Sequence, residues 1–197
     1  MRARAWAACA LLLAGCVSKG PIDQERANAN WTDRRARLER IDNFTVQGRA
    51  SVSGPTSGSA NLIWHQSPRE FDLRLSGPLG VGAMSMAGNE QEVRVRSKER
   101  TFTTDDPEGA MHESLGWTLP LRGLRYWIRS LPAPDSEFSV TLDESGRVDT
   151  LTQDGWALDY TDYVTLQRLD LPRRIVLTRR DVKIRVLVDR WSDLPAP

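Results

Sequence analysis

The sequence has little of what most enzymes and disulfide-bonded secreted proteins use. Its two cysteines, Cys9 and Cys16, both lie near the start, so the rest of the chain has no thiol for a disulfide, a zinc site or a nucleophile. Its two histidines, His65 and His112, stand in no metal-binding spacing. The stretch nearest to a G-x-S-x-G nucleophile elbow, residues 54–58, places its serine one position late. We therefore expect neither a catalytic centre nor a bound metal.

An excess of charge of one sign is also missing. The chain has 27 Lys and Arg against 26 Asp and Glu, and removing residues 1–15 would take away Arg2 and Arg4 and leave 25 against 26. Nucleic-acid binding requires a clustered excess of basic residues to neutralise phosphates. A nucleic-acid partner is therefore not expected.

No hydrophobic run is long enough to cross a bilayer as a helix. The apolar stretch at residues 5–13 would extend only about 14 Å, against a hydrocarbon core of about 30 Å. The string Leu13-Ala14-Gly15-Cys16 ends this stretch in the way that resembles a bacterial lipoprotein signal. We predict a signal peptide at residues 1–15 and lipidation of Cys16. An ordinary signal peptide with a chance cysteine is the alternative.

The remaining chain reads as one domain on a tether. Residues 16–27 are mostly polar and contain Gly20 and Pro21, which predicts a flexible tether after the lipidated cysteine. Residues 28–197 contain no internal repeat and fit a single domain. Of the seven tryptophans in the chain, all but Trp6 fall after the signal peptide.

Periodicity predicts a mainly β, α+β fold. A helix capped by Asn28 or Asn30 is expected to run to about Arg40, with Trp31, Leu38 and Ile41 on its apolar face and Arg34 on its solvated face. Alternating apolar positions then predict about eleven antiparallel strands, and turn signals such as Gly54-Pro55 favour a meander.

Two short helices are expected between residues 105 and 131. Asp106 caps the first, with Pro107 at its first position, and this role accounts for the acidic residues Asp105, Asp106 and Glu108 better than a cation site does. The second helix follows Pro120 and carries Arg122, Arg125 and Arg129 at helical spacing. This stripe is either a solvated face or a contact with anionic headgroups or an acidic partner.

A curved sheet with helices over its concave side can enclose an apolar pocket for acyl chains. A fully packed core is the alternative, and composition does not separate the two. The residues by themselves therefore indicate an anchored domain that is suited to lipid.

Longer strings resemble the LolB family of outer-membrane lipoprotein receptors. They follow the family's order along the mature chain, together with Tyr160 and Tyr163, and read FTVQGRA (44–50), NLIWHQ (61–66), GPLG (77–80), LGWTLP (115–120), YWIR (126–129), LPAP (131–134), QDGW (153–156) and RW (190–191).

The resemblance implies an incomplete, strongly curved antiparallel barrel whose apolar cavity lies under a helical lid. It implies a monomer that accepts lipoproteins from the periplasmic carrier LolA and inserts them into the inner leaflet of the outer membrane without nucleotide hydrolysis. No cofactor is expected, and the only attached group is the covalent lipid on Cys16. Val17, which is not an aspartate, agrees with outer-membrane sorting.

The same resemblance implies roles for single residues. Trp64, Trp127 and Trp156 are expected to line the acyl-chain cavity, and Leu79 to hand cargo to outer-membrane phospholipid. Trp117 receives no role. The alternatives are a lipoprotein that binds or senses free lipid with no protein donor, and a lipid-cleaving enzyme, which the missing nucleophile argues against.

Overall fold

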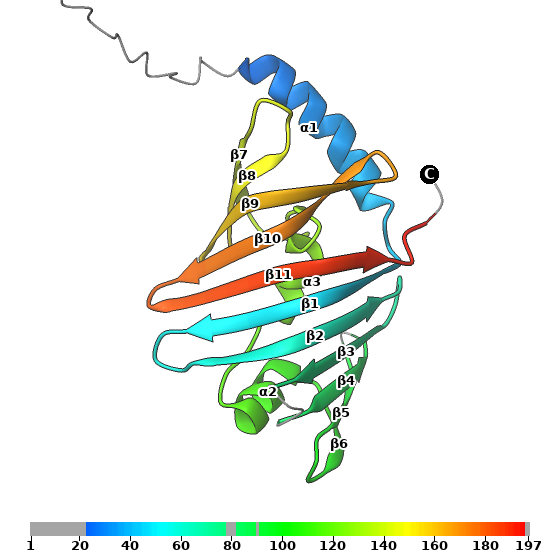
Figure 1. Cartoon of the computed structure of the whole chain (residues 1–197), viewed down its shortest axis with the longest axis vertical. Helices are drawn as coiled ribbons and strands as arrows, with labels where there is room; N and C mark the ends of the chain where they lie inside the picture. Colours follow the sequence, from blue (N-terminus) through cyan, green and yellow to red (C-terminus); the bar gives the residue numbers. More distant parts are fainter. Residues whose placement is uncertain (1–22, 78–81, 90, 196–197) are drawn as a thin grey trace, which may run out of the picture.

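The computed structural model describes residues 23–77, 82–89 and 91–195, which form eleven strands and three helices (Figure 1). The helices are α1 (Gln24–Glu39), α2 (Pro107–Leu115) and α3 (Leu121–Trp127). The strands, in chain order, are β1 (Phe44–Ser53), β2 (Gly58–Gln66), β3 (Phe71–Ser76), β4 (Met84–Gly88), β5 (Val93–Arg96), β6 (Thr101–Thr104), β7 (Phe138–Leu142), β8 (Val148–Gln153), β9 (Trp156–Leu166), β10 (Leu169–Arg179) and β11 (Val182–Ser192).

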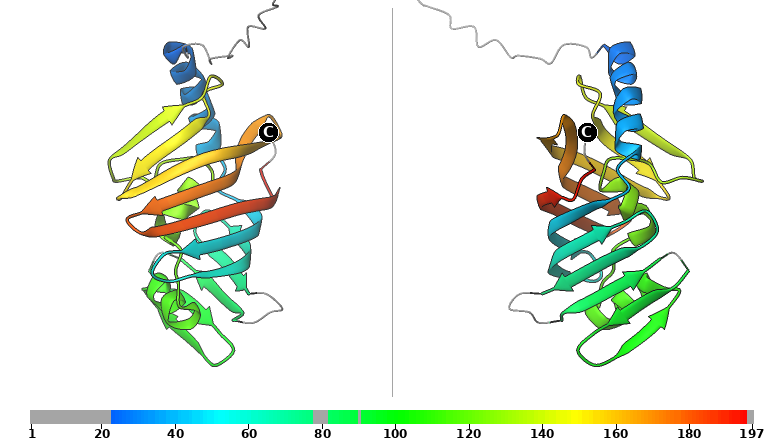
Figure 2. Two further views of the ribbon diagram at one scale, coloured as in Figure 1. Left: turned by 60° about the vertical axis from the view of Figure 1, so that its left-hand side comes forward. Right: turned by 90° about the vertical axis from the view of Figure 1, so that its right-hand side faces the viewer.

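All of these strands belong to one antiparallel sheet. Its order is β6-β5-β4-β3-β2-β1-β11-β10-β9-β8-β7, so two meanders meet where β1 pairs with β11. The edge strands β6 and β7 do not pair with each other, and the sheet twists strongly around the face that carries α2 and α3 (Figure 2). The predicted incomplete barrel of about eleven strands is confirmed.

The β1–β11 junction is tight because a glycine lies at its bulge. The register shifts between Gln47 and Gly48, where Gly48 faces Val188. A Cβ atom built on Gly48 would lie 2.1 Å from the carbonyl oxygen of Leu187, closer than any side-chain carbon can approach. Only a residue without a side chain allows the two strands to approach this closely.

Helix α1 begins earlier than predicted. Asp23, and not Asn28 or Asn30, is its N-cap, and the Asp23 carboxylate accepts a hydrogen bond from the amide of Arg26 at 3.1 Å. The predicted tether at residues 16–27 therefore overlaps the first helical turn. The polar run before Trp31 hides this start, because it buries only Ala27.

The buried face of α1 was predicted correctly at Trp31 and Leu38 but wrongly at Arg34, and Ile41 is buried just after the helix ends. Arg34 is only 9% exposed, because its guanidinium forms an ion pair with Asp170 on β10 at 2.8 Å. The stem of an arginine packs well against apolar neighbours while its charge finds a partner, so a basic residue can lie on the buried face. Among the described residues, no helix is long and apolar enough to cross a membrane.

Helices α2 and α3 lie on the inner face of the sheet (Figures 1 and 2). The predicted cap of α2 is confirmed, because Asp106 Oδ1 accepts from the amide of Gly109 at 2.9 Å. Gly116 ends α2 in the left-handed conformation, with φ of 75°. Most of the space beneath the helices is filled by side chains that are almost completely buried, including Trp64, Phe44, Leu62, Leu73, Met86, Met111, Leu119, Leu124 and Trp127.

We predict that Gly48→Ala will destabilise the protein by about 1–3 kcal/mol, because the added methyl group must push β1 away from the Leu187 carbonyl. Denaturant unfolding measures the change. Ser51→Ala on the same strand is the control and should stay within about 0.5 kcal/mol of the wild type. Equal stability of the two variants would contradict this role for Gly48.

Candidate functional site

A pocket of about 550 Å³ lies on the helical side of the sheet, between the β2–β3 hairpin and α3. Its apolar lining comes mainly from Trp64, Phe71, Leu121 and Tyr126. Charged residues of both signs complete the lining, and they are Arg69, Glu70, Asp105, Arg122, Arg125, Asp135 and Asp154. The pocket can therefore hold an apolar group while its rim contacts the polar part of the same molecule.

Trp64 forms part of the pocket wall, and the polar atom of its indole ring has a hydrogen-bond partner. The indole Nε1 donates to Gln66 Oε1 at 3.3 Å, and the Gln66 amide nitrogen donates to the carbonyl of Ser67 at 2.7 Å. The ring of Phe71 packs at 6.4 Å from that of Trp64 in a tilted arrangement. Trp64 is 2% exposed, so it supports the pocket more than it projects into it.

Trp127 occupies a different environment from Trp64. Its indole Nε1 donates to Gln153 Oε1 at 2.8 Å, and Tyr160 donates its hydroxyl to the carbonyl of Trp127 at 2.8 Å. The ring folds back over Gly123, where a Cβ atom would lie 2.3 Å from it. Trp127 is 1% exposed and touches no described pocket.

Trp156 borders a second and smaller hollow of about 340 Å³, next to Pro120 and the β10–β11 hairpin. The guanidinium of Arg179 lies 5.9 Å from its ring. The structure therefore places Trp64, Trp127 and Trp156 in three separate surroundings. Their assignment to one acyl-chain cavity stays a prediction.

Trp117, which received no role from the sequence, is buried against the start of β2. Its ring lies against Gly58 at the start of β2, where a Cβ atom would come within 2.3 Å of the ring. It is 4% exposed. Trp117 thus closes the core between β2 and the segment that joins α2 to α3.

The predicted arginine stripe does not form one surface. Arg122 and Arg125 both line the pocket, where Arg122 is exposed and the guanidinium of Arg125 lies 5.2 Å from the ring of Tyr126. Arg129 is only 6% exposed, which contradicts a solvated role for it. The reason is that α3 ends at Trp127, so the helical spacing no longer describes the position of Arg129.

Arg129 instead ties the end of α3 to the end of α1. Its Nη1 donates to the carbonyls of Leu38, at 3.2 Å, and Ile41. Its guanidinium also lies 5.4 Å from the ring of Phe44. Burial away from water, together with the charge of Arg125, lowers the pKa of Arg129 to about 10, so the side chain stays charged at neutral pH.

The histidines and acidic residues do not assemble into a reactive centre in the described part of the chain. His65 lies on the outer face of β2 and shares a hydrogen bond with Thr45 at 2.7 Å, and His112 is exposed on α2. Residues 23–77, 82–89 and 91–195 contain no group of three or more potential metal ligands. Cys16 and Leu79, the predicted lipidation and transfer residues, lie outside the described residues.

We predict that Arg129→Met will lower the free energy of unfolding by about 3 kcal/mol, because two buried carbonyls lose a charged donor. Arg122→Met removes a charge from the exposed side of α3 and should change stability by less than about 0.5 kcal/mol. Chemical denaturation distinguishes these outcomes, and similar values for both variants would refute the tie between α1 and α3.

The fold has relatives among solved structures whose sequences differ widely. A LolA superfamily protein from Nitrosomonas europaea superposes with a TM-score of 0.52 at 9% identity, covering 87% of this chain and 94% of that one. A DUF1329 family protein from Desulfovibrio piger gives 0.51 at 7% identity, covering 87% and 93%. At such identities the likeness concerns the fold alone.

Sequence comparison is more specific. The family model described as "Outer membrane lipoprotein LolB" matches residues 42–191. Proteins named "Outer-membrane lipoprotein LolB" are 36% identical in Stutzerimonas stutzeri, over 93% of this chain and 91% of the relative, and 35% identical in Chromohalobacter salexigens, over 96% and 91%. The same name is given to a Pseudomonas aeruginosa protein that is 36% identical over 92% of this chain and 91% of its own length. The chain therefore belongs to the LolB family of outer-membrane lipoproteins.

Proposed function

We propose that the protein receives lipoproteins from the periplasmic carrier LolA and releases them into the inner leaflet of the outer membrane. The pocket between the β2–β3 hairpin and α3 is the observation that carries this proposal, because its apolar wall and charged rim match an acyl chain joined to a polar head. Family membership supports the same role.

An apolar pocket of this kind attracts an acyl chain without a chemical step. Each buried methylene contributes about 0.8 kcal/mol, so a few carbons of contact give useful affinity. Trp64, Phe71 and Leu121 supply the apolar contact, and Arg122 and Glu70 at the rim can meet the polar part of the cargo. The proposed function requires no nucleotide, metal, cofactor or catalytic residue.

The pocket is small for complete cargo. Its volume of about 550 Å³ lies within the range usual for a site that holds one small molecule, and buried side chains fill the space beyond it. Accommodation of a second or third chain therefore requires α3 to move. Both ends of α3 are held by hydrogen bonds, because the Glu108 carboxylate on α2 accepts from the amides of Leu121 and Arg122 at its start, and Tyr160 and Gln153 bond Trp127 at its end. Such a movement must therefore break bonds of this kind.

Differences in binding affinity then drive the transfer. A ligand moves from one binding protein to another when the second binds it better, and from there to the bilayer when more apolar surface is covered. The lipid on Cys16 keeps the protein, acting as a monomer, at the membrane where release takes place. It is an anchor and takes no part in binding cargo.

Phe71→Gln should reduce uptake of a lipoprotein from loaded LolA about tenfold, because a partly buried phenyl group contributes about 1.5 kcal/mol of apolar contact. Transfer is measured with purified proteins in the absence of ATP. Ile63→Gln is the matched control, since Ile63 is 37% exposed on the neighbouring strand and lines no described pocket.

Equal uptake by Phe71→Gln and Ile63→Gln would place the acyl site elsewhere. Binding of free lipid without any uptake from LolA would instead favour the alternative, a lipid-binding or lipid-sensing lipoprotein with no protein donor. Circular dichroism of both variants separates either result from loss of the fold.

The proposed function also predicts how cargo is released. Leu79 stands in a Gly-Pro-Leu-Gly string, where a large aliphatic side chain is unusual for a turn. Burying one leucine contributes about 1.5–3 kcal/mol, enough to help a tethered protein engage the bilayer but too little to anchor it. Leu79→Glu should leave uptake from LolA unchanged and cause cargo to accumulate on the protein instead of reaching liposomes.

Ser57→Glu is the control for this variant, because it adds the same charge to the exposed β1–β2 turn. It should take up and release cargo normally. A comparable release defect in Ser57→Glu, or a clear fall in the melting temperature of Leu79→Glu, would show that Leu79 has no specific part in release.

A further inference from the structure

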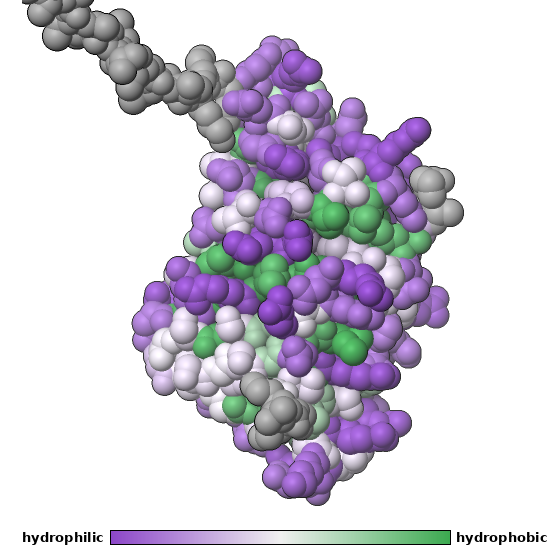
Figure 3. All heavy atoms as spheres, in the orientation of Figure 1, coloured by the Kyte–Doolittle hydropathy of each residue, from purple (hydrophilic) through white to green (hydrophobic). Residues whose placement is uncertain are grey.

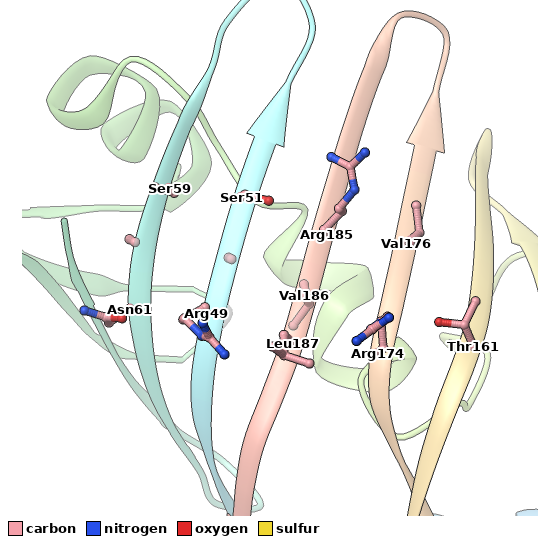
Figure 4. A pocket seen from close by; sticks show the side chains of 12 residues that line it. Arg49, Ser51, Ser59, Asn61, Thr161, Arg174, Val176, Arg185, Val186 and Leu187 are labelled. Atoms are coloured by element: carbon pink, nitrogen blue, oxygen red, sulfur yellow. The ribbon is translucent and has the colours of Figure 1, made fainter. Parts of the chain in front are cut away.

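A third hollow lies on the outer face of the sheet, opposite the helices. It measures about 870 Å³ and runs across β2, β1, β11, β10 and β9. Figure 4 shows Arg49, Arg174 and Arg185 projecting into it on the near side of the sheet, with the helices behind. In the space-filling view of this face, apolar patches are separated by hydrophilic side chains (Figure 3). We refer to this hollow as the outer groove.

Strand register gathers the three arginines around one leucine. Leu187 on β11 faces Arg49 on one side and Arg174 on the other. Arg185 lies two residues from Leu187 on the same face, so it is the diagonal neighbour of both other arginines. Diagonal neighbours in a sheet are about 7–8 Å apart, within reach of long side chains. Arg49 and Arg174 lie level with Leu187 on either side of it, and the guanidinium of Arg185 points along β11 towards the hairpin (Figure 4). Rotation of the long Arg185 side chain would bring it to the same ligand.

The positive charge of the outer groove is only partly neutralised. Arg49 forms an ion pair with Asp189 at 3.2 Å, and both side chains are well exposed. Within the described part of the chain, Arg174 and Arg185 form no ion pair, and no acidic residue lines the groove. The nearest carboxylate in the register is that of Asp162 on β9, which faces Arg174 and lies 3.8 Å from the guanidinium of Arg173.

The nature of the groove points to an anion that has an apolar part. Arginine binds phosphate oxygens through two parallel N–H donors, which suits a phosphodiester. Leu187 and Val176 lie between the arginines and are only partly buried, so they offer apolar contact beside the charge. A nearly balanced net charge of +1 for the whole chain makes a nucleic acid a poor match.

We propose that the outer groove binds the phosphate headgroup of an anionic phospholipid at the membrane surface. This docking would lay the outer face of the sheet on the bilayer. The pocket beside Trp64 and Phe71 is on the other face, so it would then open towards the periplasm. The groove thus sets the orientation in which cargo is received, a role distinct from the anchor and from the pocket.

Vesicle sedimentation tests this proposal with residues 16–197 carrying Cys16→Ser, a chain that keeps every described element and lacks the lipid anchor. The vesicles contain either equal parts of phosphatidylglycerol and phosphatidylcholine or phosphatidylcholine alone. The chain should bind only the first kind. Arg174→Gln with Arg185→Gln should weaken that binding about 25-fold, since each arginine near an anionic surface contributes about fivefold.

The matched control is Arg26→Gln with Arg40→Gln, which removes the same charge from exposed positions at the start of α1 and just after its end, outside the groove. It should bind within about twofold of the parent chain. Equal weakening in both double variants would overturn the proposal in favour of nonspecific attraction. Binding that does not depend on phosphatidylglycerol would overturn it as well.

Inorganic phosphate provides a further test. If phosphate displaces the chain from vesicles at concentrations that leave a polylysine peptide bound to them, the groove is a free-phosphate site instead. Binding to an acidic peptide but not to vesicles would assign the groove to a protein partner.

Discussion

Strands β1 and β11 come from opposite ends of the chain, and their backbone hydrogen bonds join two meanders that would otherwise be separate sheets of six and five strands. Everything that forms the pocket depends on this junction. It joins β2, which carries Trp64, to the sheet that α3, which carries Trp127, covers (Figure 1). The absence of a side chain at Gly48 is what permits the approach.

Hydrogen bonds from buried polar groups hold the helices on that surface. Gln153 accepts a hydrogen bond from the indole of Trp127, and Arg129 donates one to the carbonyl of Leu38 near the end of α1. A buried polar atom without a partner costs more than an apolar one, so each of these bonds specifies one arrangement of the helix and not merely its contact with the core. Most of them lie at the C-terminal end of α3. At the end that borders the pocket, the Glu108 carboxylate on α2 accepts from the amides of Leu121 and Arg122.

The two faces of the sheet differ in chemistry, and this difference suits a protein that works between an aqueous carrier and a bilayer. The inner face is apolar and covered, and the pocket beside the β2–β3 hairpin reaches solvent. The outer face has exposed arginines around a partly buried leucine. Under the functions proposed above, cargo contacts the first face and phospholipid the second, and a single sheet keeps the two apart.

The sequence by itself determined the elements that local patterns describe. Alternating apolar residues predicted the strands, and Asp106 with Pro107 predicted the start of α2, because both signals act over a few neighbouring residues. The start of α1 was missed, since its first turn buries only Ala27. The family resemblance, not periodicity, supplied the open barrel and its proposed cargo.

Only the tertiary structure decided which residues share a surface. The pairing of β1 with β11, the burial of Arg34 and Arg129, and the separation of Trp64 from Trp156 all depend on contacts between residues far apart in sequence. Side-chain type does not reveal such contacts, because an arginine or a tryptophan can lie equally well on a rim or in a core. The outer groove has the same origin. Arg49, Arg174 and Arg185 form a cluster only because hydrogen bonding between strands sets them in register.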